Sequence, residues 1–350
     1  MRVLLVDPAA YTPAYDHELA SALAAAGADV ELLTSRFRFG ETPGPEGYVR
    51  SERFYPLSSR LFRRSRLRLP VRLAEHAVGL AGLALRRRRA DVTHFQWLPL
   101  PQLDDLVLRR TAPVVLTAHD VLPRRTASKE ALWRRVFAHV EAVVVHSERA
   151  RRTLLALGVA PGRLRVIPHP VFRSDVARAD DGRTVLALGV IRPYKQLEHA
   201  LEAARRAGAR LLVAGDPAVP VDRRAGDGAV EWRLGYLPEA ELDRALAEAT
   251  VAVFPYRAEL DQSGALLRAL GAGVPAVVYD VGGLAEPVLA YGAGRVVAAD
   301  DVAALASAIG DLLADGDALA AARAGALRAR EELTWGASAR AHLELYGDVI

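Results

Sequence analysis

The segment from Phe254 to Glu286, FPYRAELDQSGALLRALGAGVPAVVYDVGGLAE, constrains the fold more than any other part of this chain. An apolar run, 251–254, precedes a polar loop, and a helix is predicted over 265–271. A second apolar run, 276–279, follows the glycine and proline that end this helix. Continuous apolar strands around a helix are typical of a parallel sheet that is covered on both faces. The segment therefore predicts a strand–loop–helix–strand unit.

The predicted helix begins next to residues that suit an anion. Its first backbone N–H groups, from Ser263 through Gly264 and Ala265 to Leu266, have no partner within the helix. Such a terminus attracts phosphate, because the N–H groups and the helix dipole both favour negative charge. An ordinary, well-capped helix between two strands has the same pattern, so the segment alone leaves both interpretations open.

The same alternation occurs in both halves of the 350-residue chain. The first half opens with a predicted strand, Arg2–Val6, a helix, His17–Ala26, and a second strand, 30–34. After the polar stretch 173–183 the pattern restarts with a strand at Thr184–Leu188. A chain of this length can form two domains with separate cores. We therefore expect two Rossmann-like domains joined by a linker.

Several strings resemble the retaining GT-B glycosyltransferases of family 4, also called glycosyl transferases group 1. They are LLRALGAGVP followed by DVGGLAE, GVIRPYK, VVLTAHDVLP and RLRVIPHPVF. The resemblance implies an α/β fold of two parallel-sheet domains facing across a cleft, with a C-terminal helix that crosses back to the first domain. The domains implied are an acceptor domain at 1–172, a linker at 173–183, a nucleotide-sugar donor domain at 184–334 and the returning helix at 335–350.

Gly189, Arg192 and Lys195 match the family's phosphate-binding loop, and the resemblance implies that they bind the donor diphosphate with Ser263, Gly264 and Ala265. Cations are disfavoured at a helix N-terminus unless an anion compensates them. Arginine can hold a diphosphate in a bidentate way, and lysine acts as a point charge. The chain departs from the family at Gln196, where glycine is usual.

The family's usual pair of glutamates, seven residues apart, is also altered. The aligned positions hold Leu260 and Arg268, although Glu259 and Asp261 flank the first of them. An arginine cannot accept hydrogen bonds from ribose hydroxyls. We expect a variant of the family in which Glu259 or Asp261 contacts the donor sugar.

The resemblance implies further site residues. His119 corresponds to a histidine that faces the donor sugar, and it is the third catalytic candidate beside Glu259 and Asp261. The base side of the nucleotide is expected at Tyr236, Leu237 and Arg268. The sugar side of the cleft is expected at Tyr15, His94, Gly282, Gly283 and Glu286.

Metal and nucleic-acid chemistry are not expected. The chain has no cysteine, no Asp-x-Asp motif in it suits a magnesium site for a nucleotide sugar, and Asp104–Asp105 and Asp180–Asp181 are expected on polar surface. Zinc spacings and aromatic RNA-binding strings are absent, so the predicted pI of about 9.5 reflects arginine usage and no nucleic-acid partner is expected. We expect no cofactor, and the nucleoside-diphosphate sugar is a substrate.

The stretch 60–89 interleaves arginines with leucines around a predicted helix, 71–85. It suits a basic amphipathic surface that contacts anionic lipid, or a solvated edge beside a core helix. No apolar run approaches the ~20 residues that span a bilayer. We expect a cytoplasmic protein, with this stretch as a candidate peripheral contact at the inner membrane face.

The expected function is metal-independent, retaining transfer of a sugar from a nucleoside-diphosphate sugar to a glycan, a lipid-linked molecule or a small molecule. Two alternatives remain open at this level. One is a GT-B scaffold that binds without catalysis, for which Arg268 is the main support. The other is a GT-B nucleotide-sugar epimerase. The sequence does not name the sugar, the base or the acceptor.

Overall fold

A computed structural model describes residues 1–60, 68–87, 89–108, 113–123, 126–223, 228–257 and 261–350. The chain divides into two compact units, of which the first contains residues 1–168 and 335–350 and the second residues 169–334. The stretch 173–183, expected as a linker, is part of the second unit, where the N–H groups of Ser174 and Ala179 donate to Gly271 and Ala247.

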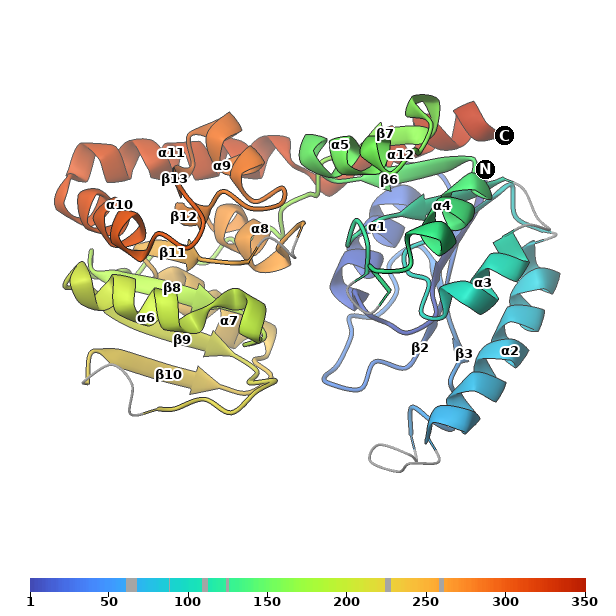
Figure 1. Cartoon of the computed structure of the whole chain (residues 1–350), viewed down its shortest axis with the longest axis horizontal. Coiled ribbons are helices and arrows are strands. Elements are labelled where there is room, and N and C mark those ends of the chain that lie inside the picture. Colours follow the sequence, from blue (N-terminus) through green and yellow to red (C-terminus); the bar gives the residue numbers. More distant parts are fainter. Residues whose placement is uncertain (61–67, 88, 109–112, 124–125, 224–227, 258–260) are drawn as a thin grey trace. The chain divides into compact units, whose positions relative to one another are not determined.

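The first unit is built on a seven-stranded parallel sheet of order β3-β2-β1-β4-β5-β6-β7 (Figure 1). Strands β1, β5 and β6 are nearly continuous apolar runs, and helices cover the sheet. Its elements are β1 (Arg2–Asp7), α1 (Pro13–Ala25), β2 (Asp29–Ser35), β3 (Val49–Phe54), α2 (Arg68–Arg87), β4 (Val92–Phe95), α3 (Pro101–Leu108), β5 (Val114–Thr117), α4 (Glu130–Ala138), β6 (Ala142–Val145), α5 (Glu148–Ala156), η1 (Pro161–Arg163), β7 (Leu164–Val166) and α12 (Trp335–Val349).

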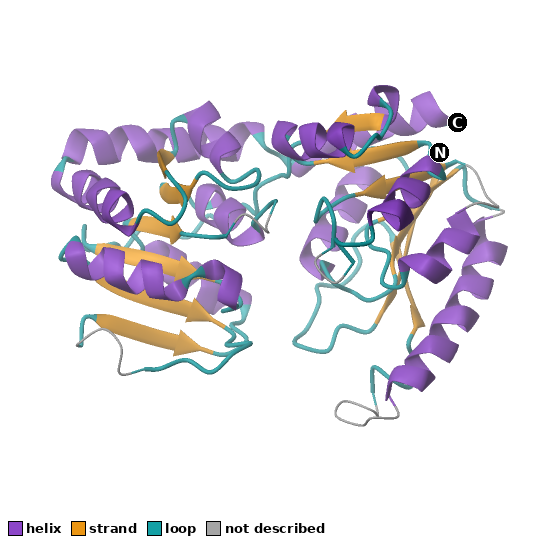
Figure 2. Cartoon of the chain, in the orientation of Figure 1, coloured by secondary structure: helices purple, strands orange, loops and turns teal. Residues whose placement is uncertain are grey.

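The second unit repeats this plan with a six-stranded parallel sheet of order β10-β9-β8-β11-β12-β13 (Figure 2). Its apolar core is formed by the strands and the inner faces of the helices around them. Its elements are β8 (Thr184–Leu188), η2 (Pro193–Lys195), α6 (Leu197–Arg206), β9 (Arg210–Gly215), β10 (Val230–Leu234), α7 (Glu239–Glu248), β11 (Val251–Phe254), α8 (Gly264–Gly271), β12 (Ala276–Tyr279), α9 (Ala285–Tyr291), β13 (Gly294–Val297), α10 (Val302–Ala314) and α11 (Gly316–Glu332).

The C-terminal helix α12 returns to the first unit. It packs against α1, and the hydroxyl of Tyr346 lies 2.6 Å from Nδ1 of His94. Both side chains are completely buried, so the returning helix is part of this unit's core. The expected α/β architecture with a returning helix is therefore confirmed.

Asp104 and Asp105 correct one expectation. They were expected on polar surface, but each is only 1 % exposed on α3. Asp104 lies 2.7 Å from Nε2 of His76, and Asp105 accepts from Arg135 at 2.9 Å and from His139 at 2.7 Å. Buried carboxylates need such partners, which explains why this helix turns its charged residues inward.

Candidate functional site

A lysine, a glycine and the start of a helix meet at the carboxyl ends of β8 and β11 in the second unit. Gly189 follows β8 with a φ of +93° and donates its N–H to Ala214. A Cβ at Gly189 would lie 2.9 Å from Nζ of Lys195 and 3.5 Å from Cβ of Ala265. Ligands of open α/β sheets bind at the carboxyl ends of strands. The structure thus brings together three residues that the sequence predicts for the donor diphosphate.

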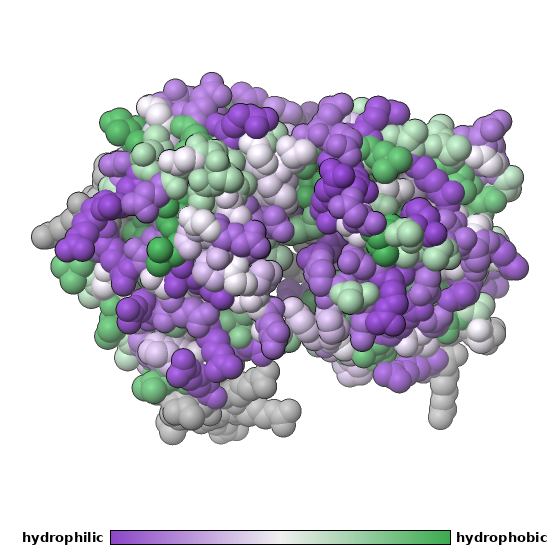
Figure 3. All heavy atoms as spheres, turned by 180° about the vertical axis from the view of Figure 1, so that it is seen from behind, coloured by the Kyte–Doolittle hydropathy of each residue, from purple (hydrophilic) through white to green (hydrophobic). Residues whose placement is uncertain are grey.

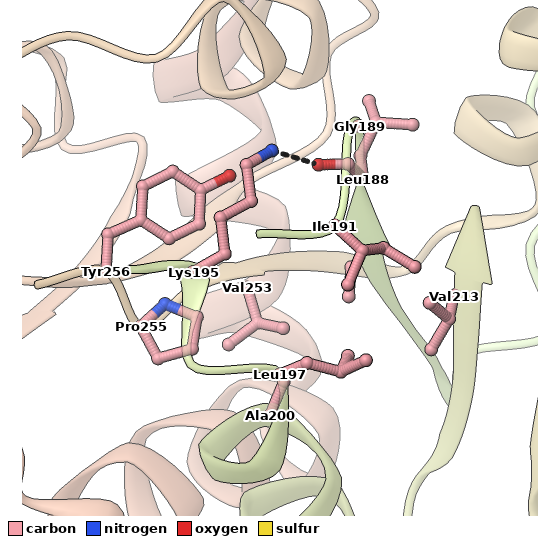
Figure 4. A pocket seen from close by; sticks show the side chains of 11 residues that line it. Leu188, Gly189, Ile191, Lys195, Leu197, Ala200, Val213, Val253, Pro255 and Tyr256 are labelled. Atoms are coloured by element: carbon pink, nitrogen blue, oxygen red, sulfur yellow. Dashed lines mark hydrogen bonds between the residues drawn. The ribbon is translucent and has the colours of Figure 1, made fainter. Parts of the chain in front are cut away.

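Lys195 is a half-buried residue, and its ammonium group lies in this place (Figure 4). Its Nζ donates to the carbonyl oxygen of Leu188 at 3.1 Å and lies 5.1 Å from the centre of the Tyr256 ring. Burial, and secondarily the neighbouring charge of Arg192, lowers the pKa of Lys195 to about 7. Among the described residues no carboxylate forms a salt bridge with Lys195, so an anionic ligand would suit the charged form.

Helix α8 points its N-terminus toward the same place. Ser263 caps the helix, because its hydroxyl accepts from the N–H of Leu266 at 3.3 Å. Gly264 and Ala265 are the first helical residues, whose N–H groups the helix itself does not use. Capping therefore explains Ser263, and the two N–H groups after it are the ones that suit a phosphate.

Gln196 shows why glycine is usual after the lysine. Its φ of +46° and ψ of +54° are left-handed, a conformation that glycine adopts without strain. The glutamine is held there because its Nε2 donates to Asp300 at 2.6 Å. Gln196 thus keeps the loop geometry by a side-chain anchor, and the exposed Arg192 begins the same turn.

Arg268 has protein partners in this structure. Its guanidinium lies 4.6 Å from the centre of the Phe172 ring and pairs with Glu239 at the start of α7. Both interactions hold the side chain against its own unit. We therefore leave Arg268 out of the proposed donor contacts.

The remaining described candidates of the second unit lie on loops, except Glu286, which is in the first turn of α9. The N–H of Gly283 donates to the backbone carbonyl of Asp261 at 2.6 Å, and the N–H of Glu286 donates to Gly283 at the start of α9. Tyr236 is half-exposed after β10, and Leu237 packs against the core. Gly282 has a φ of +50° in the turn before α9. Glu259 lies outside the described residues. Among the described residues, Asp261 is the carboxylate nearest to it in the sequence.

His119 lies in an aromatic cluster at the carboxyl ends of the first unit's strands. Its ring stacks on Trp97 at 5.1 Å, meets Tyr15 edge-on at 4.7 Å and lies 5.3 Å from His146. The Nε2–H donates to the amide oxygen of Gln96 at 2.9 Å. This hydrogen bond fixes the ring orientation of a half-buried histidine.

His94 and Tyr15 lie deeper in the same unit. His94 is completely buried, with its two nitrogens 2.6 Å from Tyr346 and 2.7 Å from the hydroxyl of Thr117. Burial holds the pKa of His94 well below its usual value, so the ring is neutral. Tyr15 is 2 % exposed. Neither offers a surface to a sugar, and we assign both a packing role beneath His119.

Two residues of these clusters were missed by the sequence analysis. Tyr256 follows β11 after Pro255, and Trp97 follows β4 after Gln96 in the string HFQW. Their signal was the position at the carboxyl end of a predicted strand, which is where ligands of such sheets bind. The described residues contain no group of acidic, histidine or cysteine side chains that could hold a metal ion.

Two parallel Rossmann-like sheets and a helix that returns to the first unit define the GT-B class of fold. A family model described as "Glycosyltransferase Family 4" matches residues 15–173, and one described as "Glycosyl transferases group 1" matches residues 182–315. Together these matches span most of the chain. The chain therefore belongs to the GT-B glycosyltransferases of group 1 and family 4, and the expected family is confirmed.

Solved structures agree on the fold. Sucrose-phosphate synthase of Thermosynechococcus elongatus is 21% identical with a TM-score of 0.73, over 99% of this chain and 98% of that one. The Anabaena protein HepE, solved in complex with UDP-glucose, is 13% identical with a TM-score of 0.73, over 100% of both chains. At these identities the likeness concerns the fold alone.

A curated protein is similar to part of this chain in sequence. An exopolysaccharide phosphotransferase of Streptomyces coelicolor is 32% identical over an alignment of 245 positions, and the alignment covers 62% of this chain and 26% of that protein. The chain thus spans about a quarter of the length of this relative. No helix in the described part of the chain is long and apolar enough to cross a membrane.

Proposed function

We propose that this chain is a retaining, metal-independent glycosyltransferase that moves a sugar from a nucleoside-diphosphate sugar to an acceptor. The observation that carries the proposal is the convergence of Lys195, Gly189 and the N-terminus of α8. The ammonium group of a half-buried lysine beside unused backbone N–H groups suits a diphosphate better than a neutral ligand. The retaining outcome rests on the family.

These residues have a direct role in the proposed reaction. When the bond between the sugar and the diphosphate breaks, negative charge develops on the leaving phosphate oxygen. Lys195, Arg192 and the N–H groups of Gly264 and Ala265 supply positive charge where this oxygen would lie, without a metal. Fixed charges aimed at developing charge are the largest common source of rate enhancement.

Thermal unfolding with UDP, GDP, ADP and TDP, each without metal, tests the donor site. A ligand that binds only the folded state raises the melting temperature by mass action. We expect one of the four to do so, and UDP is the first choice because the Anabaena relative was solved with UDP-glucose. If none of the four shifts the melting temperature at millimolar concentration, the proposed donor site is wrong.

His119 is proposed to contact the transferred sugar. We expect His119→Ala to lower turnover by roughly 10²-fold, the scale of a positioned polar side chain in the transition state. The melting-temperature shift with the nucleoside diphosphate should stay unchanged, because His119 belongs to the other unit. His139→Ala is a matched control, since that histidine binds Asp105 on α3. Turnover by His119→Ala at the wild-type rate would contradict this role.

A catalytically inactive GT-B scaffold is the second candidate, and one observation favours it. Arg268 stands where the family has a carboxylate, and its pairing with Glu239 and Phe172 makes it part of the protein packing. An inactive scaffold could bind the nucleotide as well, so binding does not distinguish it from an active enzyme. A turnover assay does. Release of the nucleoside diphosphate from a donor sugar, with or without acceptor, supports the enzyme.

The acceptor is proposed only by class. The arginines of 60–89 suit contact with an anionic membrane, where a lipid-linked acceptor would be presented. In the described part of this stretch, however, Arg72 and Arg86 turn toward their own unit, over Tyr55 and to Glu31. The surface that α2 presents is therefore different from the basic face expected from the sequence.

A further inference from the structure

Helix α2 directs polar side chains toward the protein and apolar side chains outward. Its polar side chains face the protein: Glu75 accepts from the N–H groups of Leu57 at 2.6 Å and Ser58 at 3.1 Å. His76 is completely buried between the hydroxyl of Tyr55 and the carboxylate of Asp104, each 2.7 Å away. These contacts satisfy the buried polar groups, so the inward polar face costs little.

The outward side of α2 is apolar along its length. Leu69, Leu73, Val78 and Leu85 are 65 %, 40 %, 73 % and 68 % exposed. The other exposed residues of this helix between them are Pro70, Ala74, Ala77, Ala81 and Gly82. Thus no exposed side chain of the described residues 69–85 is charged. A surface helix of a soluble protein ordinarily shows the opposite arrangement.

The neighbouring helix α3 is inverted in the same way. It lies beside α2 (Figure 1). The hydrogen bond between His76 and Asp104 joins the two helices. Asp104 and Asp105 are buried, whereas Leu103 and Leu106 are 36 % and 53 % exposed. We name the exposed apolar residues of α2 and α3 the apolar outer face.

Single exposed leucines are normal, and hydrophobic residues lie scattered among hydrophilic ones on the side of the molecule shown in Figure 3. A whole helix face of them is different, because monomeric soluble proteins rarely expose large contiguous apolar patches. Two adjacent helices with the same inversion indicate a surface that meets an apolar phase.

The charges around the apolar outer face indicate which kind of apolar surface it contacts. Arg60 and Arg89, which precede and follow α2 in the sequence, are both exposed. The acidic residues described on the two helices, Glu75, Asp104 and Asp105, all bond inward. An apolar strip between cationic ends, without an exposed carboxylate on the described helices, complements anionic headgroups over acyl chains.

We propose that the apolar outer face of α2 and α3 lies in the surface of an anionic lipid bilayer, with the flanking arginines at the headgroups. The proposal rests on the proposed glycosyltransferase function and narrows its acceptor to molecules presented at that surface. A second copy of the chain fits less well, because pairing two such faces would bring cationic ends together with no described carboxylate between them.

Sedimentation with vesicles tests the proposal. The full chain is mixed with vesicles of equal parts phosphatidylglycerol and phosphatidylcholine, and with vesicles of phosphatidylcholine alone. We expect binding to the anionic vesicles only. The double variant L73Q/V78Q should bind them roughly tenfold or more weakly, because two apolar side chains no longer enter the bilayer. Glutamine is a good helix former, so α2 should persist.

A matched control makes the same change elsewhere. Leu289 and Leu327 are 68 % and 47 % exposed on the second unit, and L289Q/L327Q should bind vesicles as the wild type does. No binding of the wild type to anionic vesicles, or unchanged binding of L73Q/V78Q, would overturn the proposal. So would a dimer in solution that L73Q/V78Q dissociates, since the partner is then a second copy.

The nucleotide readout separates this proposal from the one on which it rests. L73Q/V78Q should keep the melting-temperature shift with the nucleoside diphosphate, because both residues lie outside the second unit. A wild type that binds vesicles but no nucleoside diphosphate retains the docking surface and loses the proposed function. A wild type that binds the nucleotide but no vesicle shows the reverse.

Discussion

Lys195→Met should abolish the response to nucleoside diphosphates while leaving the protein folded. The substitution keeps the length of the side chain and removes the charge that faces Gly189 and α8. Loss of a charge-assisted hydrogen bond to phosphate costs about 3 kcal/mol, roughly 100-fold in affinity. Turnover should fall further, because charge on the leaving group grows in the transition state. Calorimetric titration with the nucleotide and donor turnover measure the two effects.

The direction in which Lys195→Met changes stability follows from the pKa of Lys195. Burial lowers the pKa of Lys195 to about 7, from the usual value of 10.5. Between these values the unfolded chain binds more protons than the folded one, so wild-type stability rises with pH across this window. Lys195→Met removes this rise and should be at least as stable as the wild type at pH 7. Urea unfolding at pH 7 and pH 9 measures both statements.

The chain offers a direct check, because Lys129 and Lys195 are its only lysines. After reductive methylation with ¹³C, each gives one NMR signal, and Lys129→Met and Lys195→Met assign them. The Lys195 signal should titrate near pH 7 in the free protein and at higher pH with the nucleotide bound. Lys129→Met is also the matched control for binding, since it lies on the first unit. A Lys195 signal indifferent to the nucleotide would refute the diphosphate contact.

The central strands could be predicted from the sequence and two edge strands could not. β8, β11 and β12 are short apolar runs between turn residues, and the expected ranges match the observed ones. β3 and β10 have the sequences VRSERF and VEWRL and lie at the sheet edges. An edge strand is buried less completely, so its residues need not be apolar, and periodicity gave no strand signal there.

The orientation of α2 and α3 also lay beyond the sequence. Periodicity locates a helix but does not say which of its faces meets the core. The inversion depends on His76 meeting Asp104 and on Glu75 capping the backbone at Leu57. These partners are far apart in the chain and are brought together only by the sheet. The adjacent aspartates therefore looked like polar surface.

The surroundings of the loop 189–196 could not be predicted from the sequence either. The sequence predicted Arg192 and Lys195 as charges at a helix start. It could not show that folding withdraws the ammonium group from water beside Tyr256 and the carbonyl of Leu188. This desolvation, and secondarily the neighbouring charge of Arg192, lowers its pKa. Desolvation depends on residues that come from other strands, so it appears only in the folded unit.

Gly215→Ala should displace the loop 189–196, which carries the proposed diphosphate contacts Gly189, Arg192 and Lys195. Gly215 ends β9, and a Cβ there would lie 2.2 Å from the carbonyl oxygen of Gly189. No real Cβ tolerates this distance to a backbone atom, so Gly189 must move away from its place beside Lys195. Overpacking of this kind costs about 2–3 kcal/mol of stability. Nucleotide affinity should fall at least roughly tenfold, because misplaced binding groups lose their alignment.

Gly208→Ala separates this clash from the general cost of replacing a glycine. Gly208 has a φ of +64°, and a Cβ there would meet no atom within 4 Å. Its substitution should cost only about 1 kcal/mol of backbone strain and leave nucleotide binding unchanged. Urea unfolding and calorimetric titration of both variants give the comparison. If Gly215→Ala binds the nucleotide as tightly as Gly208→Ala, the close approach of β9 to Gly189 does not position the diphosphate loop.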